Sequence, residues 1–301
     1  MLKKLSDLHD IVKKKQQVKR LVLAVAHDEH SLEAVNAAVK KKYIEAILVG
    51  DAAEIRKIAE KNKKIDLNQF EIIDEPNTNE AVAKAVKLVH YGEGDILMKG
   101  NVGTATLLKG VLNKEWGLRK NEVLSHIALF EVQVYHHKLI SLTDVAMNIA
   151  PDLNTKIGII NNSVEFLRKL GIQTPKVAVV GAVELVNESM PATMDAALLS
   201  KMADRGQIKD CIIDGPLAFD NAISAESAKH KGIVSNVAGD ADLLLLPDIE
   251  AGNVLYKAFV FFAKAKVAAV VLGARAPIVL TSRSDSEESK LDSIVLAAAI
   301  A

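Results

Sequence analysis

Short apolar runs alternate with longer amphipathic segments along almost the whole chain. The runs consist mainly of Val, Ile, Leu and Ala, as buried β-strands do. Between many of them lie stretches such as SLEAVNAAVKKK and NEAVAKAVKLVHYG. In these stretches apolar residues recur at i, i+3, i+4 and i+7, which is typical of one face of a helix. The pattern predicts strands at residues 21–26, 46–49, 70–73, 96–98, 139–142, 177–180, 211–213, 243–246, 267–272 and 278–280.

Strands that alternate with helices predict an α/β fold, with mostly parallel sheet flanked by helices. Ten strands are many for one small sheet, so we expect two lobes. The stretch TDVAMNIAPDLNTKIG contains Pro151 and several turn-forming residues, and it separates the first set of strands from the second. The final strand, turn and helix return to the first lobe. We therefore predict a first lobe of residues 1–138 plus 275–301 and a second lobe of residues 139–274.

Charge and composition exclude several classes of protein. Lys plus Arg and Asp plus Glu both number 38, which leaves no basic field for a nucleic-acid backbone. Aromatic residues make up 4% of the chain, too few for base-stacking platforms. The apolar end SIVLAAAIA is far shorter than the roughly 20 residues of a spanning helix, so we expect no membrane partner. The single cysteine, Cys211, forms no internal disulfide, and we expect a cytoplasmic protein.

Candidate chemistry follows the predicted strands, because parallel sheets bind ligands beyond the carboxyl ends of their strands. Many residues in these positions are polar or glycine. They are His27-Asp28, Gly50-Asp51, Lys99-Gly100-Asn101, Thr143-Asp144, Gly181, Asp214-Gly215-Pro216, Pro247-Asp248 and Thr281-Ser282-Arg283.

The segment after the last strand is the most informative of these. Ser284 and Glu287 have the spacing of a capping box and predict a helix start. Free backbone N–H groups and the helix dipole make such a start an anion site, and Arg283 adds a fork that can bind phosphate with two bonds. The alternative is an ordinary capped helix with Arg283 in a surface ion pair.

A second glycine-bearing turn, KGNVGT, follows the strand at 96–98. Gly100 lets the backbone approach a ligand, and Lys99 can balance a phosphate charge; Asn101 and Thr104 complete this candidate site. The order of residues is not that of a Walker A loop. The alternative is a plain turn between a strand and a helix.

Two acidic blocks in the second lobe offer further candidates. Asp214, directly after a predicted strand, holds either a ligand or its own turn before Gly215-Pro216. Asn253, in PDIEAGNVLYK, binds a ligand or only caps a helix. Cys211 is expected to pack in an apolar strand. The sequence contains no H-E-x-x-H pattern, and we expect no metal site.

Taken together, these segments resemble the phosphate acetyl/butyryltransferase family from about residue 20 onward. The resemblance rests on KGNVGTATLLKGVL, LTDVAMNIAPDLNTK, VNESMPATMDAALLSKMADRGQI, DGPLAFDNAIS, KGIVSNVAGDADLLLLPDIEAGNVLYK and PIVLTSRSDS. The K-G-N-V loop and the form of the last block are more like the butyryl-specific members than the acetyl-specific ones.

The resemblance implies a reversible reaction, in which acyl-CoA and orthophosphate give acyl phosphate and free CoA. It implies two α/β lobes with the active site in the cleft between them, direct transfer in a ternary complex, and CoA as a substrate rather than a bound cofactor. By the same resemblance, Arg283 binds the phosphoryl group and Ser282 hydrogen-bonds the thiol or the oxyanion. An aspartate takes the thiol proton; here the spacing departs from the family pattern and leaves Asp285 and Asp292 as candidates.

Other functions stay open at this point. An acetyl-preferring member of the family, or a non-catalytic acyl-CoA binding protein on the same scaffold, fits the same segments. A metal-dependent decarboxylating dehydrogenase is disfavoured, because its cluster of metal-binding aspartates is not apparent. Family members self-associate, so we expect a homo-oligomer.

Overall fold

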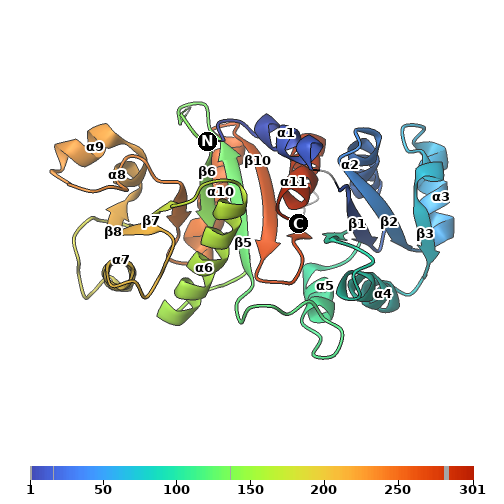
Figure 1. The fold of residues 1–301 in the computed structure, drawn as a ribbon, viewed down its shortest axis with the longest axis horizontal. Coiled ribbons are helices and arrows are strands. Elements are labelled where there is room, and N and C mark those ends of the chain that lie inside the picture. Colours follow the sequence, from blue (N-terminus) through green and yellow to red (C-terminus); the bar gives the residue numbers. More distant parts are fainter. Residues whose placement is uncertain (1, 16, 136, 281–284) are drawn as a thin grey trace. The chain divides into compact units, whose positions relative to one another are not determined.

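The computed structural model describes residues 2–15, 17–135, 137–280 and 285–301. The chain forms two compact units (Figure 1). Unit 1 comprises Met1–Leu5 and Val123–Val267, and unit 2 comprises Ser6–Glu122 and Ala268–Ala301. Each unit has a mostly parallel sheet with flanking helices. The predicted α/β fold is confirmed.

Unit 2 is built on strands in the order β3-β2-β1-β4-β11-β10, with β10 antiparallel to β11 and the other pairs parallel. Two of its helices, α2 and α3, start at aspartate caps that follow strands: the carboxylate of Asp28 accepts a hydrogen bond from Ser31 N, and Asp51 accepts from Ala53 N and Glu54 N. Such caps satisfy N–H groups that the helix leaves free. The elements are α1 (Ser6–Lys14), β1 (Lys19–Ala24), α2 (Glu29–Lys40), β2 (Ile44–Gly50), α3 (Ala52–Lys61), the 3₁₀ turn η1 (Leu67–Gln69), β3 (Glu71–Asp74), α4 (Thr78–His90), β4 (Ile96–Lys99), α5 (Thr104–Val111), β10 (Lys266–Leu272), β11 (Ile278–Val279) and α11 (Glu287–Ile300).

Unit 1 has its strands in the order β5-β6-β9-β7-β8. β5 pairs antiparallel with β6, and the remaining pairs are parallel. Helix α6 crosses in front of the sheet in Figure 1 and packs on β5, where Asn162 donates to Ser125 Oγ. The elements are β5 (Ser125–Glu131), β6 (Ile140–Thr143), α6 (Leu153–Lys169), β7 (Lys176–Gly181), α7 (Pro191–Asp204), β8 (Ile212–Ala218), α8 (Phe219–Ile223), α9 (Ala225–His230), β9 (Leu243–Leu245) and α10 (Ile249–Phe261).

Strand β5 is absent from the predicted set. It joins β6 as an antiparallel neighbour, with Ala128 opposite Leu142, so a search for strand–helix alternation passes over it. This pairing places β5 in unit 1, and the boundaries along the chain fall at residues 122/123 and 267/268, whereas the prediction put them at 138/139 and 274/275. Residues 2–5 also belong to unit 1, because Leu5 N donates to the carboxylate of Glu131.

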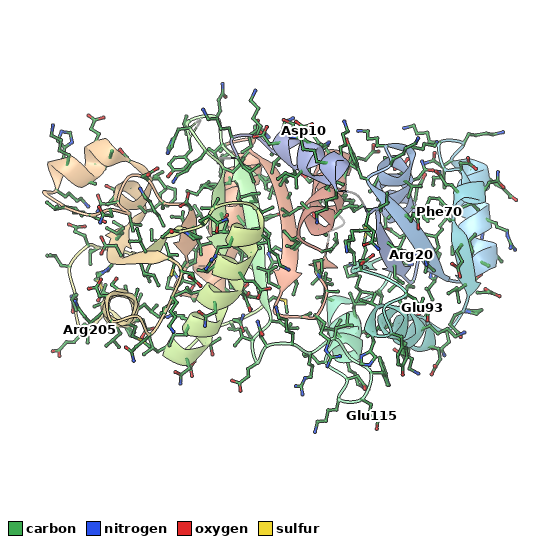
Figure 2. All side chains as sticks on the ribbon, viewed as in Figure 1. Asp10, Arg20, Phe70, Glu93, Glu115 and Arg205 are labelled. Carbon is green, nitrogen blue, oxygen red and sulfur yellow. The ribbon has the colours of Figure 1, made fainter. Side chains whose placement is uncertain are left out.

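The sheets form the apolar core of each unit, and charged groups cover its outside. In β1 the run from Leu21 to Ala24 is fully buried. Charged side chains such as Glu93, Glu115 and Arg205 are exposed (Figure 2). The hydrophobic core therefore lies between each sheet and its helices, as the apolar faces of the predicted elements require.

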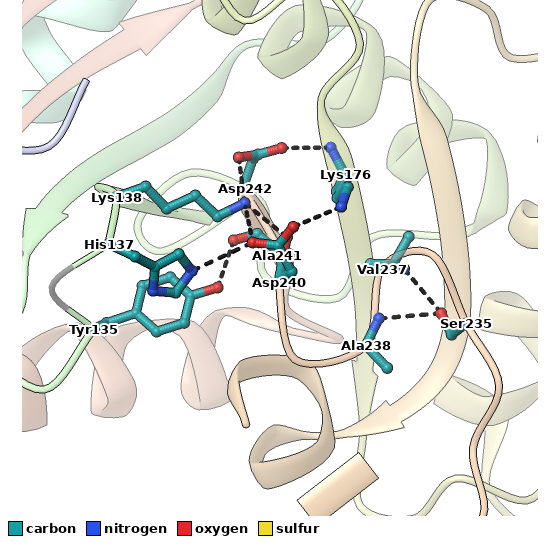
Figure 3. A network of polar contacts seen from close by, with 10 residues as sticks. All are labelled: Tyr135, His137, Lys138, Lys176, Ser235, Val237, Ala238, Asp240, Ala241 and Asp242. Carbon is teal, nitrogen blue, oxygen red and sulfur yellow. Dashed lines mark hydrogen bonds and ion pairs between the residues drawn. The ribbon is translucent and has the colours of Figure 1, made fainter. Parts of the chain in front are cut away.

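A partly buried network of charges joins the starting ends of β6, β7 and β9 in unit 1 (Figure 3). Lys138 Nζ lies 2.7 Å from Asp242 Oδ1 and 2.9 Å from Asp240 Oδ1. Lys176 Nζ contacts the other oxygen of Asp240, and Tyr135 donates its hydroxyl hydrogen to Ala241 O. Burial raises the pKa of Asp240, but hydrogen bonds from Lys176 and Lys138 outweigh it and lower that pKa to about 2. The network fixes the edge of the sheet opposite to the carboxyl ends of these parallel strands.

Candidate functional site

The carboxyl ends of three parallel strands lie side by side in unit 2. The register pairs Ala24 of β1 with Lys99 of β4, and Met98 of β4 with Val279 of β11. The KGNVGT turn therefore leaves the sheet beside the chain that continues from β11 towards residue 281. Thr281, Ser282, Arg283 and Ser284 lie outside the described residues, so the roles of Ser282 and Arg283 stay predictions.

The KGNVGT turn is held tightly against β1. Gly100 N donates to Ala24 O (2.9 Å) and Asn101 N donates to Val25 O (2.8 Å). A Cβ at position 100 would lie 2.3 Å from Val25 O, so only glycine fits this close approach. Main-chain hydrogen bonds and close packing thus hold the turn in place at the carboxyl edge of the sheet.

The predicted binding residues of this turn occupy different positions on it. Lys99 is half-buried, and its ammonium group donates to Val102 O (3.3 Å) and, weakly, to Gly100 O (3.4 Å). Asn101 is exposed, and Thr104 is the exposed first residue of α5 after the N-cap Gly103. Lys99 thus places a positive charge at the turn, while Asn101 and Thr104 leave polar groups accessible to a ligand.

His27, three residues after the end of β1, is a residue that the sequence analysis noted without assigning a role. Its buried Nδ1 atom has no hydrogen-bond partner among the residues that the structure describes. A Cβ at Gly50 would lie 3.3 Å from this Nδ1 atom. An unsatisfied buried ring nitrogen costs free energy, so its presence at the carboxyl edge makes His27 a candidate member of the site.

The two candidate aspartates of the last segment have different surroundings. Ser286, and not Ser284, is the N-cap of α11, and its hydroxyl accepts from Ser289 N (3.1 Å). The predicted capping box is therefore wrong by two residues. Asp285 lies just before this cap, half-buried, and its main-chain oxygen accepts from Lys290 Nζ (2.6 Å).

Asp292 lies further along α11, where that helix packs on α1. It is buried, and its Oδ1 atom lies 3.0 Å from His9 Nε2. The other ring nitrogen of His9 lies 2.8 Å from the hydroxyl of Tyr43. Asp292 is thus linked through His9 to Tyr43 in unit 2.

In unit 1, the carboxyl end of β6 brings two predicted residues together. Asp144 is buried; its Oδ1 atom accepts from Ala146 N and Met147 N, and Oδ2 accepts from Asn148 Nδ2. Asn253 Nδ2 donates to Val145 O, in the same loop (3.2 Å). Asn253 is therefore close to Asp144 in the fold, although the two are far apart in the sequence.

Helix α10 needs the glycine of the PDIEAGN block to reach this loop. A Cβ at Gly252 would lie 2.3 Å from Asp144 O and 3.1 Å from Val145 Cα. The helix is capped by Asp248, whose carboxylate accepts from Ala251 N. The alternative in which Asn253 caps the helix is wrong, since Asn253 lies in its second turn.

Asp214 is not directly after a strand. It lies inside β8, opposite Ala178 of β7, and its Oδ1 atom accepts from Gly215 N (2.8 Å). The strand continues to Ala218 through a cis Gly215–Pro216 peptide. The sequence predicts that the strand ends before Gly215 and Pro216, but both residues lie within it, at a shift in its register.

His126 is a buried residue that the sequence analysis missed, because β5 was not predicted. It is 6% exposed, and its Nδ1 atom has no hydrogen-bond partner in the described part of the chain. Burial lowers its pKa, and the nearby charge of Asp144 opposes that shift. The signal that could have revealed it is the apolar run at 125–131, which begins with two polar residues.

A surface groove of about 600 Å³ in unit 1 contains none of the predicted residues. It is lined by Asn161, Val164, Glu165, Arg168, Lys169, Gln173, Gln207, Lys209 and Asp210. Across residues 2–15, 17–135, 137–280 and 285–301, no three His, Cys, Asp or Glu side chains gather as metal ligands would. The helices of these same ranges include none with the length and apolar character that crossing a membrane requires.

The fold is that of the phosphotransacylases. A branched-chain phosphotransacylase from Enterococcus faecalis V583 superposes with a TM-score of 0.82 and 35% identity, covering 93% of this chain and 98% of that one. The family model described as Phosphate acetyl/butaryl transferase matches residues 6–84 and 68–298. The chain belongs to this phosphate acetyl/butyryl transferase family, and the predicted resemblance is confirmed.

Two curated relatives of different acyl preference have similar sequence identity to this chain. The phosphate butyryltransferase of Clostridium acetobutylicum is 51% identical over 301 residues, which cover 100% of this chain and 99% of the relative. The phosphate acetyltransferase of Thermotoga maritima is 49% identical over 283 residues, covering 94% and 95%. Full-length similarity thus extends to both acyl preferences.

Proposed function

We propose that this protein transfers a short acyl group reversibly between CoA and orthophosphate, with butyryl or branched-chain groups preferred. The observation that carries the proposal is the 51% identity to a phosphate butyryltransferase along the entire chain. The similarity to a branched-chain phosphotransacylase structure supports the same class of acyl group. Acyl-CoA and phosphate are then the substrates, and CoA is not a resident cofactor.

In the proposed reaction the CoA thiolate attacks the carbonyl carbon of the acyl phosphate. The C–S bond forms, the bond from the carbonyl carbon to the phosphate oxygen breaks, and phosphate leaves with the electron pair. A carboxylate takes the thiol proton, because a thiol with a pKa of about 8.5 is mostly protonated at neutral pH. The reverse direction makes acyl phosphate from acyl-CoA.

Arg283 and Lys99 are proposed to neutralise the phosphate charge, with Ser282 bonded to the thiol or to the oxyanion. The adjacent strand ends of unit 2 support this grouping, since β4 leads into the KGNVGT turn and β11 leads towards residue 281. Fixed donors around a developing charge are typically the largest single contribution to such catalysis. Gly100, Asn101 and Thr104 would line the same site.

The proton acceptor is proposed to be Asp285 or Asp292. Asp285 precedes the N-cap of α11, where the helix dipole favours a carboxylate and an anion-binding role. Asp292 is buried against His9, which ties its carboxylate to the packing of α1 on α11. Asp292→Asn and Asp285→Asn separate the two, because loss of the base lowers kcat by roughly 100-fold or more.

Three residues of unit 1 are proposed as further substrate contacts. Asp144 lies in the loop at the carboxyl end of β6, and Asn253 of α10 donates a hydrogen bond to the same loop, which supports both. Asp214 is less well supported, since it lies within β8.

The direct test is a CoA-release assay with purified protein, phosphate and a series of acyl-CoAs from acetyl to isovaleryl. We expect release that depends on phosphate, is fastest at four to five carbons and persists with a chelator. Arg283→Ala should raise the KM for phosphate far more than Cys211→Ala. Equal losses in the two variants would remove Arg283 from the site.

The alternatives predict other outcomes in the same assay. Fastest release from acetyl-CoA would indicate a phosphate acetyltransferase, which the 49% identical Thermotoga maritima relative makes a specific alternative. CoA binding without release would indicate a non-catalytic acyl-CoA binding protein. Release without phosphate would indicate a thioesterase.

We further propose that the protein acts as a homo-oligomer in the cytoplasm. A single cysteine supports a reducing compartment. Large apolar side chains on the surface of unit 1 support self-association.

A further inference from the structure

His27 lies at the carboxyl edge of the sheet of unit 2, where the chain passes from β1 to α2. Ala26 N donates to Val49 O (2.9 Å), so this segment continues beside the end of β2. A Cβ at Gly50 would lie 3.3 Å from the Nδ1 atom of His27. The ring therefore lies close to the end of β2, and glycine at position 50 leaves room for it.

The imidazole of His27 is a polar group without a partner in the described ranges of the chain. Its Nδ1 atom is buried, and neither ring nitrogen has a hydrogen bond to a residue of those ranges. His9, His90 and His137 differ, because each has a ring nitrogen within hydrogen-bond distance of another group. His27 as a whole is only half-buried, so part of it is accessible to a ligand. Buried polar atoms in proteins are nearly always paired, so the unpaired nitrogen indicates that a further group binds here.

The KGNVGT turn, proposed above to hold phosphate, lies two strands away along the same edge. The register pairs Ala24 of β1 with Val49 of β2 on one side and with Lys99 of β4 on the other. Neighbouring strands are about 4.8 Å apart, so about 10 Å separates the ends of β2 and β4. A ligand bound at the KGNVGT turn therefore has to be extended to reach His27, and orthophosphate alone is too small to contact both places.

The ionised groups closest to His27 along this edge are negative. Asp28 caps α2, Asp51 caps α3, and the carboxylate of Asp74 at the end of β3 accepts from Ala52 N. Carboxylates disfavour a further anion in their neighbourhood, so a phosphate group is a poor partner for His27. An uncharged polar group is favoured instead.

Acyl-CoA has an extended, uncharged part with suitable polar groups. The arm between its thioester and its nucleotide is a flexible chain that contains amide groups. A neutral imidazole has one donor nitrogen and one acceptor nitrogen, so it can pair with either the N–H or the C=O of an amide. The arm thus has the shape and the chemistry that the edge between the KGNVGT turn and His27 requires.

We propose that His27 binds the amide-bearing arm of acyl-CoA, which lies across the end of β1 between the KGNVGT turn and Gly50. The proposal rests on the acyl-transfer function proposed above and names a further substrate-binding residue for it. His27 contacts the substrate away from the reacting atoms, so its contribution is to binding and not to the chemical step.

The first test is the KM for acyl-CoA in His27→Phe, which keeps an aromatic ring but removes its hydrogen bond. This KM should rise about three- to tenfold, as expected for the loss of one hydrogen bond, while kcat and the KM for phosphate stay unchanged. His27→Gln should restore most of the affinity, because its amide can both donate and accept. His30→Phe is the matched control and should change nothing, since His30 is an exposed histidine in the first turn of the same helix.

A shortened substrate locates the contact on the arm. With S-butyryl-pantetheine, which has the arm but no nucleotide, His27→Phe should raise the KM by the same factor. An effect confined to the full acyl-CoA would place the contact on the nucleotide and overturn the proposal, and so would an equal effect in His30→Phe. Circular dichroism and the thermal midpoint establish that each variant is folded, and His27→Ala takes the place of His27→Phe if the larger ring is not tolerated.

Calorimetric titration with free CoA separates this inference from the proposed function. His27→Phe should bind CoA about three- to tenfold more weakly than the wild-type protein, whether or not an acyl group is transferred. Unchanged affinity for CoA in the folded variant would refute the role of His27. A wild-type protein that binds CoA but transfers no acyl group would count only against the proposed function.

Discussion

His9 Nε2 lies 3.0 Å from Oδ1 of Asp292, and this contact joins the first helix of unit 2 to the last. Asp292 is buried, and the other nitrogen of His9 is bonded to Tyr43. The contact assigns Asp292 a structural partner that its position in the sequence, nine residues after Arg283, does not reveal.

The first prediction concerns this pair. His9→Ala and Asp292→Asn should each lower the free energy of unfolding by about 1–3 kcal/mol, because each removes or weakens the hydrogen bond between the two side chains. The double variant should lose less than the sum of the two, measured by urea unfolding. Strictly additive losses would mean that the contact carries no energy. If Asp292→Asn lowers kcat about 100-fold while His9→Ala does not, Asp292 is the base as well.

Gly252 gives a prediction about packing at the candidate site. Gly252→Ala should lower the free energy of unfolding by about 1–3 kcal/mol, because its Cβ would lie 2.3 Å from the main-chain oxygen of Asp144. Gly181→Ala is the control in the same unit, since the contacts of its Cβ would be ordinary, at 3.5 Å and longer. Equal thermal midpoints for the two variants would contradict the close approach.

The lowered pKa of Asp240 predicts that the free energy of unfolding depends on pH in the acid range. Its pKa is about 2 in the folded protein and near 3.8 without the network, so the folded state holds the ionised form more strongly. This contribution is fully present above pH 3.8 and is lost as the pH falls towards 2. In Asp240→Asn the free energy of unfolding should therefore fall less steeply between pH 5 and pH 2 than in the wild-type protein, as measured by urea unfolding. Asp204→Asn, which removes an exposed carboxylate paired with Lys201, should leave the slope unchanged; a similar flattening there would refute the assignment.

The raised pKa of the Cys211 thiol predicts that this side chain reacts slowly with thiol reagents. Burial and the neighbouring charge of Asp210 raise the pKa of its thiol to about 11, so very little thiolate is present at pH 8. Modification of the native protein should proceed far more slowly than that of free CoA, and should accelerate in denaturant. A rapid reaction of the native protein at pH 8 would contradict the raised pKa. Cys211→Ala should retain the proposed activity, which makes it a clean background for the thiol assay.

The sequence by itself determined the fold class and most of the strands. Apolar runs between amphipathic segments are local patterns, and they mark both the parallel strands and their helices. Motif blocks such as PDIEAGN and TSRSDS were likewise enough to identify the family, because sequence similarity depends only on the order of the residues.

Only the tertiary structure decided which residues meet. Strand β5 was missed because an antiparallel neighbour lacks the crossover helix that the pattern expects. Asn253 is joined to the Asp144 loop, and His9 to Asp292, across more than one hundred residues of sequence. Such contacts depend on how distant segments pack, and no local pattern of hydrophobic and polar positions contains that information.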